Sequence, residues 1–141
     1  MINVLIDTGF WFAKYKPTDQ HHKQAMRVLL DPKIHYLLLP FPSFYEVFNT
    51  KFCKRQGDMN SLSAYLENFK KEYIDDDNYR YSALEITWLE GKLHKFPKSL
   101  VDNVIRGILD DPNIKVDALL TFNVEDFYDI CIKNKIEIIS G

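Results

Sequence analysis

The chain has 141 residues, of which 46% are hydrophobic and 14% are aromatic. This length is typical of one domain, which we expect to cover residues 1–141, and the composition excludes a chain that is mainly disordered. The 18 basic and 20 acidic residues leave a net charge of −2. That balance gives no bulk attraction to nucleic acid or to an anionic membrane.

The sequence favours a protein of the reducing cytoplasm with no membrane partner. The longest apolar run, around residues 36–39, is too short to span a bilayer. The first residues carry no basic region or cleavage site of the kind found in secretion signals. The two cysteines, Cys53 and Cys131, lie far apart without metal-ligand spacing, which indicates reduced thiols.

Apolar runs and breaker residues predict strands that alternate with helices. Pro42 is expected to open a helix that ends at Gly57, and Ser99 to cap the helix that starts at Leu100. The helix at 79–94 is expected to use Ala83, Leu84, Ile86 and Leu89 as core contacts. Strands are predicted at 2–6, 35–39, 116–121 and 136–139, with an ambiguous one at 73–74, and helices at 10–13, 19–30, 42–57, 58–69, 79–94, 100–109 and 124–133. This order predicts an α/β fold with three layers, in which helices flank a mostly parallel sheet of four to five strands.

Acidic and amide side chains follow the ends of several predicted strands. Asp7 ends the first strand, and Glu46 lies one turn into the helix after the second. Asp102 lies in the first turn of its helix, and Asn123 and Asp126 follow the strand that ends at Thr121. Ligands in open α/β sheets bind beyond the carboxyl ends of the strands, so these groups are candidates for one shared site. The competing explanation for each single position is a helix cap.

A cluster of carboxylates needs a cation, because like charges a few ångströms apart repel one another. Oxygen ligands without His or Cys favour Mg²⁺ or Mn²⁺ over Zn²⁺. A carboxylate-bound Mg²⁺ typically acts on phosphate oxygens, where it generates hydroxide and stabilises an in-line displacement. The pattern therefore predicts hydrolysis of phosphodiester bonds.

Four stretches in this order resemble the PIN domain, and in particular the VapC-like ribonuclease toxins. They span nearly the whole chain: Val4-Leu5-Ile6-Asp7-Thr8, Pro42-Ser43-Phe44-Tyr45-Glu46-Val47, Ser99-Leu100-Val101-Asp102-Asn103-Val104-Ile105 and Leu119-Leu120-Thr121-Phe122-Asn123-Val124-Glu125-Asp126-Phe127. Each motif is weak alone, whereas the ordered set is fairly specific. The resemblance implies a PIN-like α/β fold and a metal-dependent endoribonuclease directed at single-stranded or loop RNA.

The resemblance also assigns roles at the site. It implies that Asp7 and Asp102 bind Mg²⁺ or Mn²⁺, and that Glu46 completes the site and positions or deprotonates water. Thr8 matches a family hydroxyl that bonds a ligand carboxylate. The fourth polar position of the family follows Thr121, where this chain has Asn123. Asp126 either supplies the missing fourth charge or caps the following helix.

Partners follow from the resemblance and from local charge. The relatives imply the toxin of a VapBC-type toxin–antitoxin pair, a homodimer, and an antitoxin whose C-terminal segment fills the groove near the acids. RNA, including tRNA, is the expected substrate, with Lys51, Lys54, Arg55 and Arg106 as candidate phosphate contacts. The alternatives are a solvated helix face for the first three and an ion pair of Arg106 with Asp102 or Asp110.

Two other functions stay open at this point. Asn123 in place of an acid is compatible with a PIN-like module that binds RNA or protein and has weakened or absent nuclease activity. A nuclease of the same fold directed at DNA or at tRNA processing is a looser option, because substrate choice depends on groove shape and loop contacts.

Overall fold

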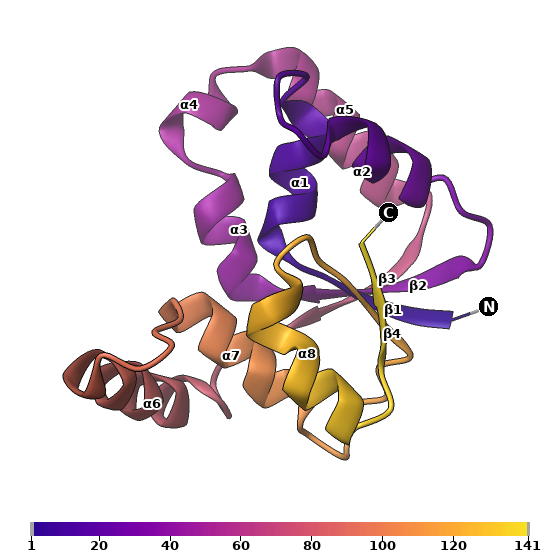
Figure 1. Cartoon of the computed structure of the whole chain (residues 1–141). Coiled ribbons are helices and arrows are strands. Elements are labelled where there is room, and N and C mark those ends of the chain that lie inside the picture. Colours follow the sequence, from indigo (N-terminus) through magenta and orange to yellow (C-terminus); the bar gives the residue numbers. More distant parts are fainter. Residues whose placement is uncertain (1, 141) are drawn as a thin grey trace.

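The structure is a computed structural model that describes residues 2–140 (Figure 1). Its strands form one parallel sheet in the order β3-β2-β1-β4-β5. They are β1 (Ile2–Ile6), β2 (Ile34–Pro40), β3 (Lys70–Ile74), β4 (Ala118–Leu120) and β5 (Glu137–Ile139). The helices are α1 (Thr8–Tyr15), α2 (His22–Val28), α3 (Phe41–Val47), α4 (Thr50–Cys53), α5 (Gln56–Glu67), α6 (Arg80–Leu93), α7 (Leu100–Leu109) and α8 (Val124–Lys133).

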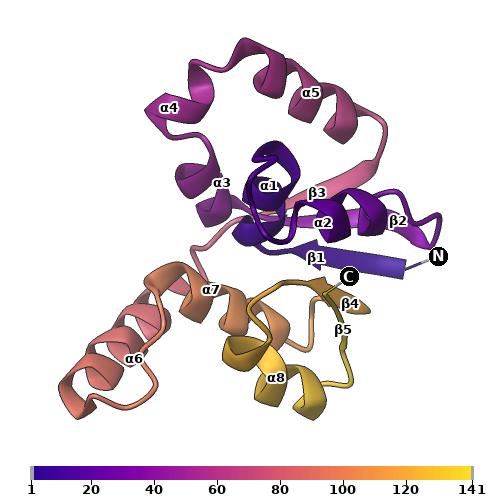
Figure 2. The ribbon, with the colours of Figure 1, turned by 45° about the horizontal axis from the view of Figure 1, so that its top comes forward.

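The central strand shows why the fold has three layers. Side chains alternate between the faces of a strand, so Val4 and Ile6 enter the core on one side of the sheet and Leu5 enters the core on the other. All three are fully buried. Residues of α1 to α5 build the first core, and residues of α6, α7 and α8 build the second. The predicted three-layer α/β fold with a parallel sheet is confirmed (Figures 1 and 2).

Several predicted boundaries agree with the structure. The first strand, the helix at 100–109 and the helix at 124–133 have the predicted limits. Ser99 caps α7, because its side chain accepts a hydrogen bond from the backbone N–H of Asp102 at 3.0 Å. The ambiguous segment at 73–74 is part of the strand β3 at one edge of the sheet.

The predicted helix from Pro42 to Gly57 was wrong. The chain forms two short helices there, α3 and α4, because Asn49 caps a new helix start by accepting the N–H of Phe52 at 3.0 Å. Gly57 and Asp58 lie in the first turn of α5, so Gly57 does not end a helix and Asp58 is not its cap. The first helix, predicted at 10–13, extends from Thr8 to Tyr15 as α1.

The predicted core contacts of α6 were also largely wrong. Ala83 is buried, whereas Ile86 and Leu89 are exposed by 46% and 56%. Figure 2 shows the reason: α6 lies at the periphery, and α7 is the neighbour that it packs against. None of the helices described between residues 2 and 140 is both long and apolar enough to cross a membrane.

Candidate metal centre

Asp7 is fixed at the carboxyl end of the central strand. Its backbone N–H donates to the Leu120 carbonyl at 3.0 Å, so Asp7 still belongs to the ladder between β1 and β4. One carboxylate oxygen accepts the N–H of Thr8, and the other accepts the Thr121 hydroxyl, both at 2.8 Å. Burial raises the pKa of the Asp7 carboxyl, although these two hydrogen bonds oppose the increase. Each oxygen keeps a further lone pair for another ligand.

Thr8 connects the first strand to the helix that carries Glu46. Its hydroxyl donates to Glu46 Oε1 at 3.0 Å, and Thr8 itself is buried. Glu46 lies in α3, which begins directly after β2 with Pro42 in its first turn. The bond orients the exposed Glu46 side chain toward the end of β1, since Thr8 follows Asp7.

Asp102 enters from the opposite layer, in the first turn of α7. Desolvation raises its pKa to about 7, and the negative charges of Asp7, Asp126 and Glu46 contribute to the increase. Asp102 therefore lies within electrostatic reach of Asp7, Glu46 and Asp126, and Asp7 lies within reach of Glu46 and Asp126. Four segments that are distant in the sequence therefore direct acidic groups to the same edge of the sheet.

The fourth segment follows β4 and contains both an amide and an acid. The buried Thr121 hydroxyl, besides donating to Asp7, accepts the N–H of Asn123 at 3.0 Å. The Asn123 amide donates to Asp126 Oδ2 at 2.5 Å. Asn123 thus holds the Asp126 side chain in place, and Asp126 is the residue that adds negative charge from this segment.

No direct ion pair with a basic side chain involves these acids in the part of the chain that the structure describes, although the charge of Asp126 helps to raise the pKa of the nearby Arg106. The ion pairs found within residues 2–140 do not include Asp7, Glu46, Asp102 or Asp126. The donor set consists of hard oxygen atoms with an excess of negative charge, which fits Mg²⁺ or Mn²⁺. Asp7 and Asp102 would hold such an ion together with Glu46 and Asp126.

The four acids are spread apart rather than drawn together. Among residues 2–140, the one group of three or more His, Cys, Asp or Glu whose ligand atoms all lie within 4.8 Å is Asp75, Asp76 and Asp77. In any three of the four candidate acids, at least one pair of ligand atoms is therefore farther apart than that.

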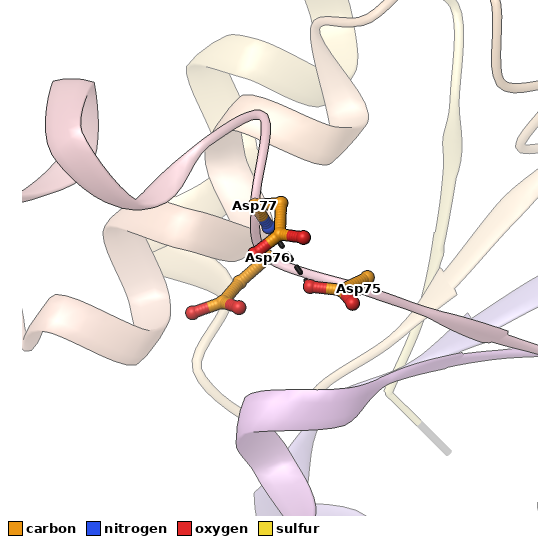
Figure 3. Close-up of side chains that lie close together, drawn as sticks. All are labelled: Asp75, Asp76 and Asp77. Carbon is orange, nitrogen blue, oxygen red and sulfur yellow. Dashed lines mark hydrogen bonds between the residues drawn. The ribbon is translucent and has the colours of Figure 1, made fainter.

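The cluster of Asp75, Asp76 and Asp77 lies in the connection between β3 and α6 (Figure 3). Asp75 accepts the backbone N–H of Asp77 at 3.0 Å, and Asp77 pairs with Arg80. The Asp76 carbonyl accepts the N–H groups of Tyr79 and Arg80. These contacts show that the three aspartates belong to the turn that precedes α6. The sequence analysis had not identified this cluster.

Arg106 has a different partner from the two that the sequence suggested. Its guanidinium pairs with both oxygens of Asp129, at 2.7 and 2.8 Å, and Nη1 also donates to the Asp126 carbonyl at 2.7 Å. The expected ion pairs with Asp102 or Asp110 do not form. Sequence reasoning missed Asp129 because it lies 23 positions after Arg106 in the chain. The hydrogen bond from Arg106 lowers the pKa of Asp129 to about 2. Arg106 thus anchors α7 to the start of α8.

The other three basic candidates lie on the helix α4 or directly after it. Lys51 and Lys54 are exposed on and after α4, and Arg55 pairs with Asp58 and donates to the Tyr15 carbonyl. Lys51 and Arg55 line a pocket of about 300 Å³. A second pocket, of about 580 Å³, lies between α8 and the connection that precedes α7, and Asp126 is the candidate acid that lines it. Its lining residues are Phe96, Pro97, Lys98, Glu125, Asp126, Tyr128 and Asp129.

Comparisons with solved structures identify the fold. Over 89% of this chain and 94% of the other, it matches VapC20 from Mycobacterium tuberculosis, a toxin that cleaves the sarcin–ricin loop, with a TM-score of 0.61 and 15% identity. The chain has the fold of VapC toxins.

Two complexes support the same fold over nearly the full length. VapBC2 from Rickettsia felis, bound to a DNA fragment from its promoter, has a TM-score of 0.58, 13% identity and coverage of 97% of both chains. DNA-bound VapBC from Salmonella typhimurium has a TM-score of 0.55 and 16% identity, with coverage of 98% of this chain and 97% of that one. No family model and no curated protein matches the sequence. The VapC-like fold is therefore visible in structure but not in overall sequence similarity.

Proposed function

We propose that the chain is an endoribonuclease that depends on Mg²⁺ or Mn²⁺ and acts as the toxin of a VapBC-type pair. The observation that supports the proposal is that the charges of Asp7, Glu46 and Asp126 all act on Asp102 near the carboxyl edge of the sheet, while none of the four acids forms a direct ion pair within residues 2–140. The VapC-like fold supports it, because VapC20, one of the structures with this fold, is a toxin that cleaves RNA in the sarcin–ricin loop.

Each residue has a proposed role in hydrolysis. When bound, the metal supplies a water of lowered pKa and positive charge for the developing phosphorane. Asp7 and Asp102 bind that metal, and Glu46 orients the attacking water and accepts its proton. Thr8 fixes the Glu46 carboxylate, and Thr121 fixes Asp7. Asn123 positions Asp126, which adds the fourth negative charge.

The proposed partners are RNA, an antitoxin and a second copy of the chain. The substrate is single-stranded or loop RNA, with tRNA as one candidate, and the reaction takes place in the cytoplasm. Lys51, Lys54 and Arg55 remain candidate phosphate contacts, whereas Arg106 would have to leave Asp129 before it could bind a phosphate. Complexes such as VapBC2 of Rickettsia felis support the antitoxin partner.

A cleavage assay with matched variants tests this proposal. Purified protein is incubated with structured RNAs in Mn²⁺, in Mg²⁺ and in chelator. We expect Asp7→Asn to reduce cleavage by more than the roughly 10- to 100-fold that loss of an outer-shell residue costs, because it removes a metal ligand. Asp76→Asn, in the turn before α6, is the matched control and should cleave normally. Cleavage by Asp7→Asn at the wild-type rate, or cleavage that persists in chelator, would contradict the proposal.

A non-catalytic RNA- or protein-binding module is the second candidate. The observation that favours it is the hydrogen bond from the Asn123 amide to Asp126. This bond uses a carboxylate oxygen of Asp126 that could otherwise bind a metal ion. Titration with Mn²⁺ by calorimetry separates the two candidates. Binding that Asp102→Asn abolishes supports the nuclease, whereas no binding at millimolar Mn²⁺ supports the module.

A further inference from the structure

The pocket between α8 and the connection from α6 to α7 has no role in the proposed hydrolysis. Its volume of about 580 Å³ is in the usual range for a small ligand. Each of the two elements contributes one aromatic side chain: Phe96 of the connection is exposed by 80%, and Tyr128 of α8 by 58%. Within residues 2–140 neither ring stacks on another aromatic ring. Both rings are therefore available to a planar group that enters the pocket.

The connection holds the Phe96 ring on a rigid support. The backbone of Phe96 has φ of 48°, which is uncommon for a bulky residue and persists only where the surroundings enforce it. Lys98 Nζ donates to the Phe96 carbonyl at 3.2 Å and to Glu90 Oε2 of α6 at 2.7 Å. The side chains of this ion pair are only 13% and 16% exposed, and Pro97 adds a fixed φ of its own. An aromatic ring on such a support loses little freedom when it binds a ligand.

The unpaired charge of the pocket is negative. Lys98 is neutralised by Glu90, and Asp129 pairs with the guanidinium that comes from α7. Glu125 and Asp126 are the other charged residues of the lining, and neither forms an ion pair within residues 2–140. Carboxylates repel a phosphate but accept hydrogen bonds from N–H groups. The pocket therefore favours a nucleobase with N–H donors over the phosphate of a nucleotide.

Guanine matches this pocket best among the four RNA bases. Its Watson–Crick edge carries N1–H and the 2-amino group side by side, and the two oxygens of one carboxylate can accept both. The same edge of adenine, cytosine or uracil has no two adjacent donor nitrogens. Glu125 is the acid that is free for this contact, because it is exposed in the first turn of α8. The Asp126 carboxylate is already bound by the Asn123 amide at 2.5 Å.

Asp126 connects the pocket to the candidate metal centre. It lines the pocket, and its negative charge acts on both Asp7 and Asp102. In RNA a base and its phosphate are joined through a single ribose. A base in the pocket would consequently belong to a nucleotide close to the phosphate on which the metal centre acts.

We propose that this pocket binds a guanine base of the substrate, which stacks on Phe96 and donates from N1–H and the 2-amino group to Glu125. The inference rests on the proposed function for the identity of the substrate as RNA, and it adds which base lies beside the cut. The affinity of the pocket for guanine requires neither metal nor cleavage, so it is measured separately.

Nucleoside titrations test the pocket in the absence of metal and cleavage. Guanosine, inosine, adenosine, cytidine and uridine are each added to the isotope-labelled full chain in chelator, and amide chemical shifts give the dissociation constants. We expect guanosine to bind most tightly and to shift the signals around Phe96 and Glu125. Inosine lacks only the 2-amino group and should bind at least about tenfold more weakly, because one hydrogen bond to a charged group is lost.

Two variants separate the stacking from the hydrogen bonds. Phe96→Leu keeps an apolar side chain without the ring, so guanosine should bind at least about fivefold more weakly. Glu125→Gln keeps the size without the charge and should remove most of the preference for guanosine over inosine. Phe41→Leu and Glu137→Gln are the same changes at exposed side chains outside the pocket lining, and they should leave guanosine binding unchanged. Equal wild-type binding of all five nucleosides would overturn the inference, as would wild-type guanosine binding in Phe96→Leu or Glu125→Gln.

The cleavage assay distinguishes a base of the substrate from a free guanine nucleotide. Among RNAs that differ only in the base at one position beside the cut, the wild type should cleave the one with guanine fastest, and Phe96→Leu should lose this preference. Guanosine binding together with cleavage that is indifferent to guanine would overturn the assignment to the substrate. Guanosine binding without any wild-type cleavage would contradict the proposed function, whereas cleavage without guanosine binding would contradict the pocket alone.

Discussion

The carboxyl of Asp102 combines partial burial with three negative neighbours, which raises its pKa to about 7. An acid with a raised pKa in the folded state binds protons more tightly there than in the unfolded chain. The metal-free protein therefore loses stability as the pH rises from about 4 to about 7, and the loss is complete above that range. The same electrostatic repulsion that disfavours the empty site favours a divalent cation in it.

Asp102→Asn should consequently stabilise the metal-free protein at pH 8. Because Asp102 is partly exposed, solvent screening reduces the gain to about 1 kcal/mol, or roughly 2–4 °C in the melting temperature. The gain should disappear near pH 4, where the wild-type carboxyl is protonated in both states. Thermal denaturation in chelator at the two pH values measures it. A gain of equal size at pH 4, or a loss at pH 8, would show that repulsion is not its origin.

Thr121 supplies one of two hydrogen bonds that hold the Asp7 carboxylate. Thr121→Val keeps the shape of this fully buried side chain but removes the donor, so the charged form of Asp7 becomes less favourable. We expect Mn²⁺ affinity to fall by about 10- to 100-fold, as is typical when a partner of a metal ligand is lost. Calorimetric titration measures the affinity, and the exposed Thr18→Val serves as the control. Unchanged affinity in Thr121→Val would contradict this role.

At the scale of elements, two caps of the same kind lie in different positions relative to the site. Ser99 caps α7 one turn before Asp102, and Asn49 caps α4 and also donates from its side-chain amide to the backbone carbonyl of Glu46 at 3.1 Å. Replacing either by Ala should cost about 1 kcal/mol of unfolding free energy, measured with urea. Ser99→Ala should weaken Mn²⁺ binding more than Asn49→Ala does, because Ser99 holds the N–H of the proposed ligand Asp102, whereas Asn49 reaches only the backbone carbonyl of Glu46. Equal Mn²⁺ affinities in the two variants would show that the Ser99 cap does not position Asp102 for metal binding.

Local signals predicted those elements whose ends are defined by local chemistry. The first strand stops at Asp7, and α7 starts at Ser99, because an apolar run and a capping side chain are both visible in the sequence. The helix after Pro42 was predicted too long because the apolar spacing of its residues continues past Asn49. In the structure Asn49 is the N-cap of a separate helix, α4. Periodicity measures how apolar a face is and not whether another element covers it.

Long-range contacts explain the other differences. The apolar face of α6 was predicted to enter the core, but the packing against α7 buries Ala83 and leaves Ile86 and Leu89 largely exposed. Arg106 was predicted to pair within its own helix, but the approach of α8 offers Asp129 with better two-pronged geometry. The candidate acids could be identified from sequence because they follow strand ends, and parallel strands bring those ends to one edge.

At the scale of the whole molecule, the sheet joins two helical layers, and the candidate metal centre draws on both. Asp7 and Glu46 come from the side of α1 and α3, whereas Asp102 and Asp126 come from α7 and α8. A bound ion would link the two layers and stabilise the native state by mass action. We expect the melting temperature of the wild type to rise with Mn²⁺ concentration, by an amount equivalent to about 2.7 kcal/mol at a hundred times the dissociation constant. Asp7→Asn should show no such dependence, and a similar increase in that variant would place the ion elsewhere.

The most direct measurement is a crystal structure with Mn²⁺ and its anomalous scattering. The account predicts a peak bounded by Asp7 and Asp102, with Glu46 and Asp126 rotated inward from their metal-free positions. A peak only at Asp75, Asp76 and Asp77, or no peak at saturating Mn²⁺, would contradict a metal centre at the carboxyl edge of the sheet.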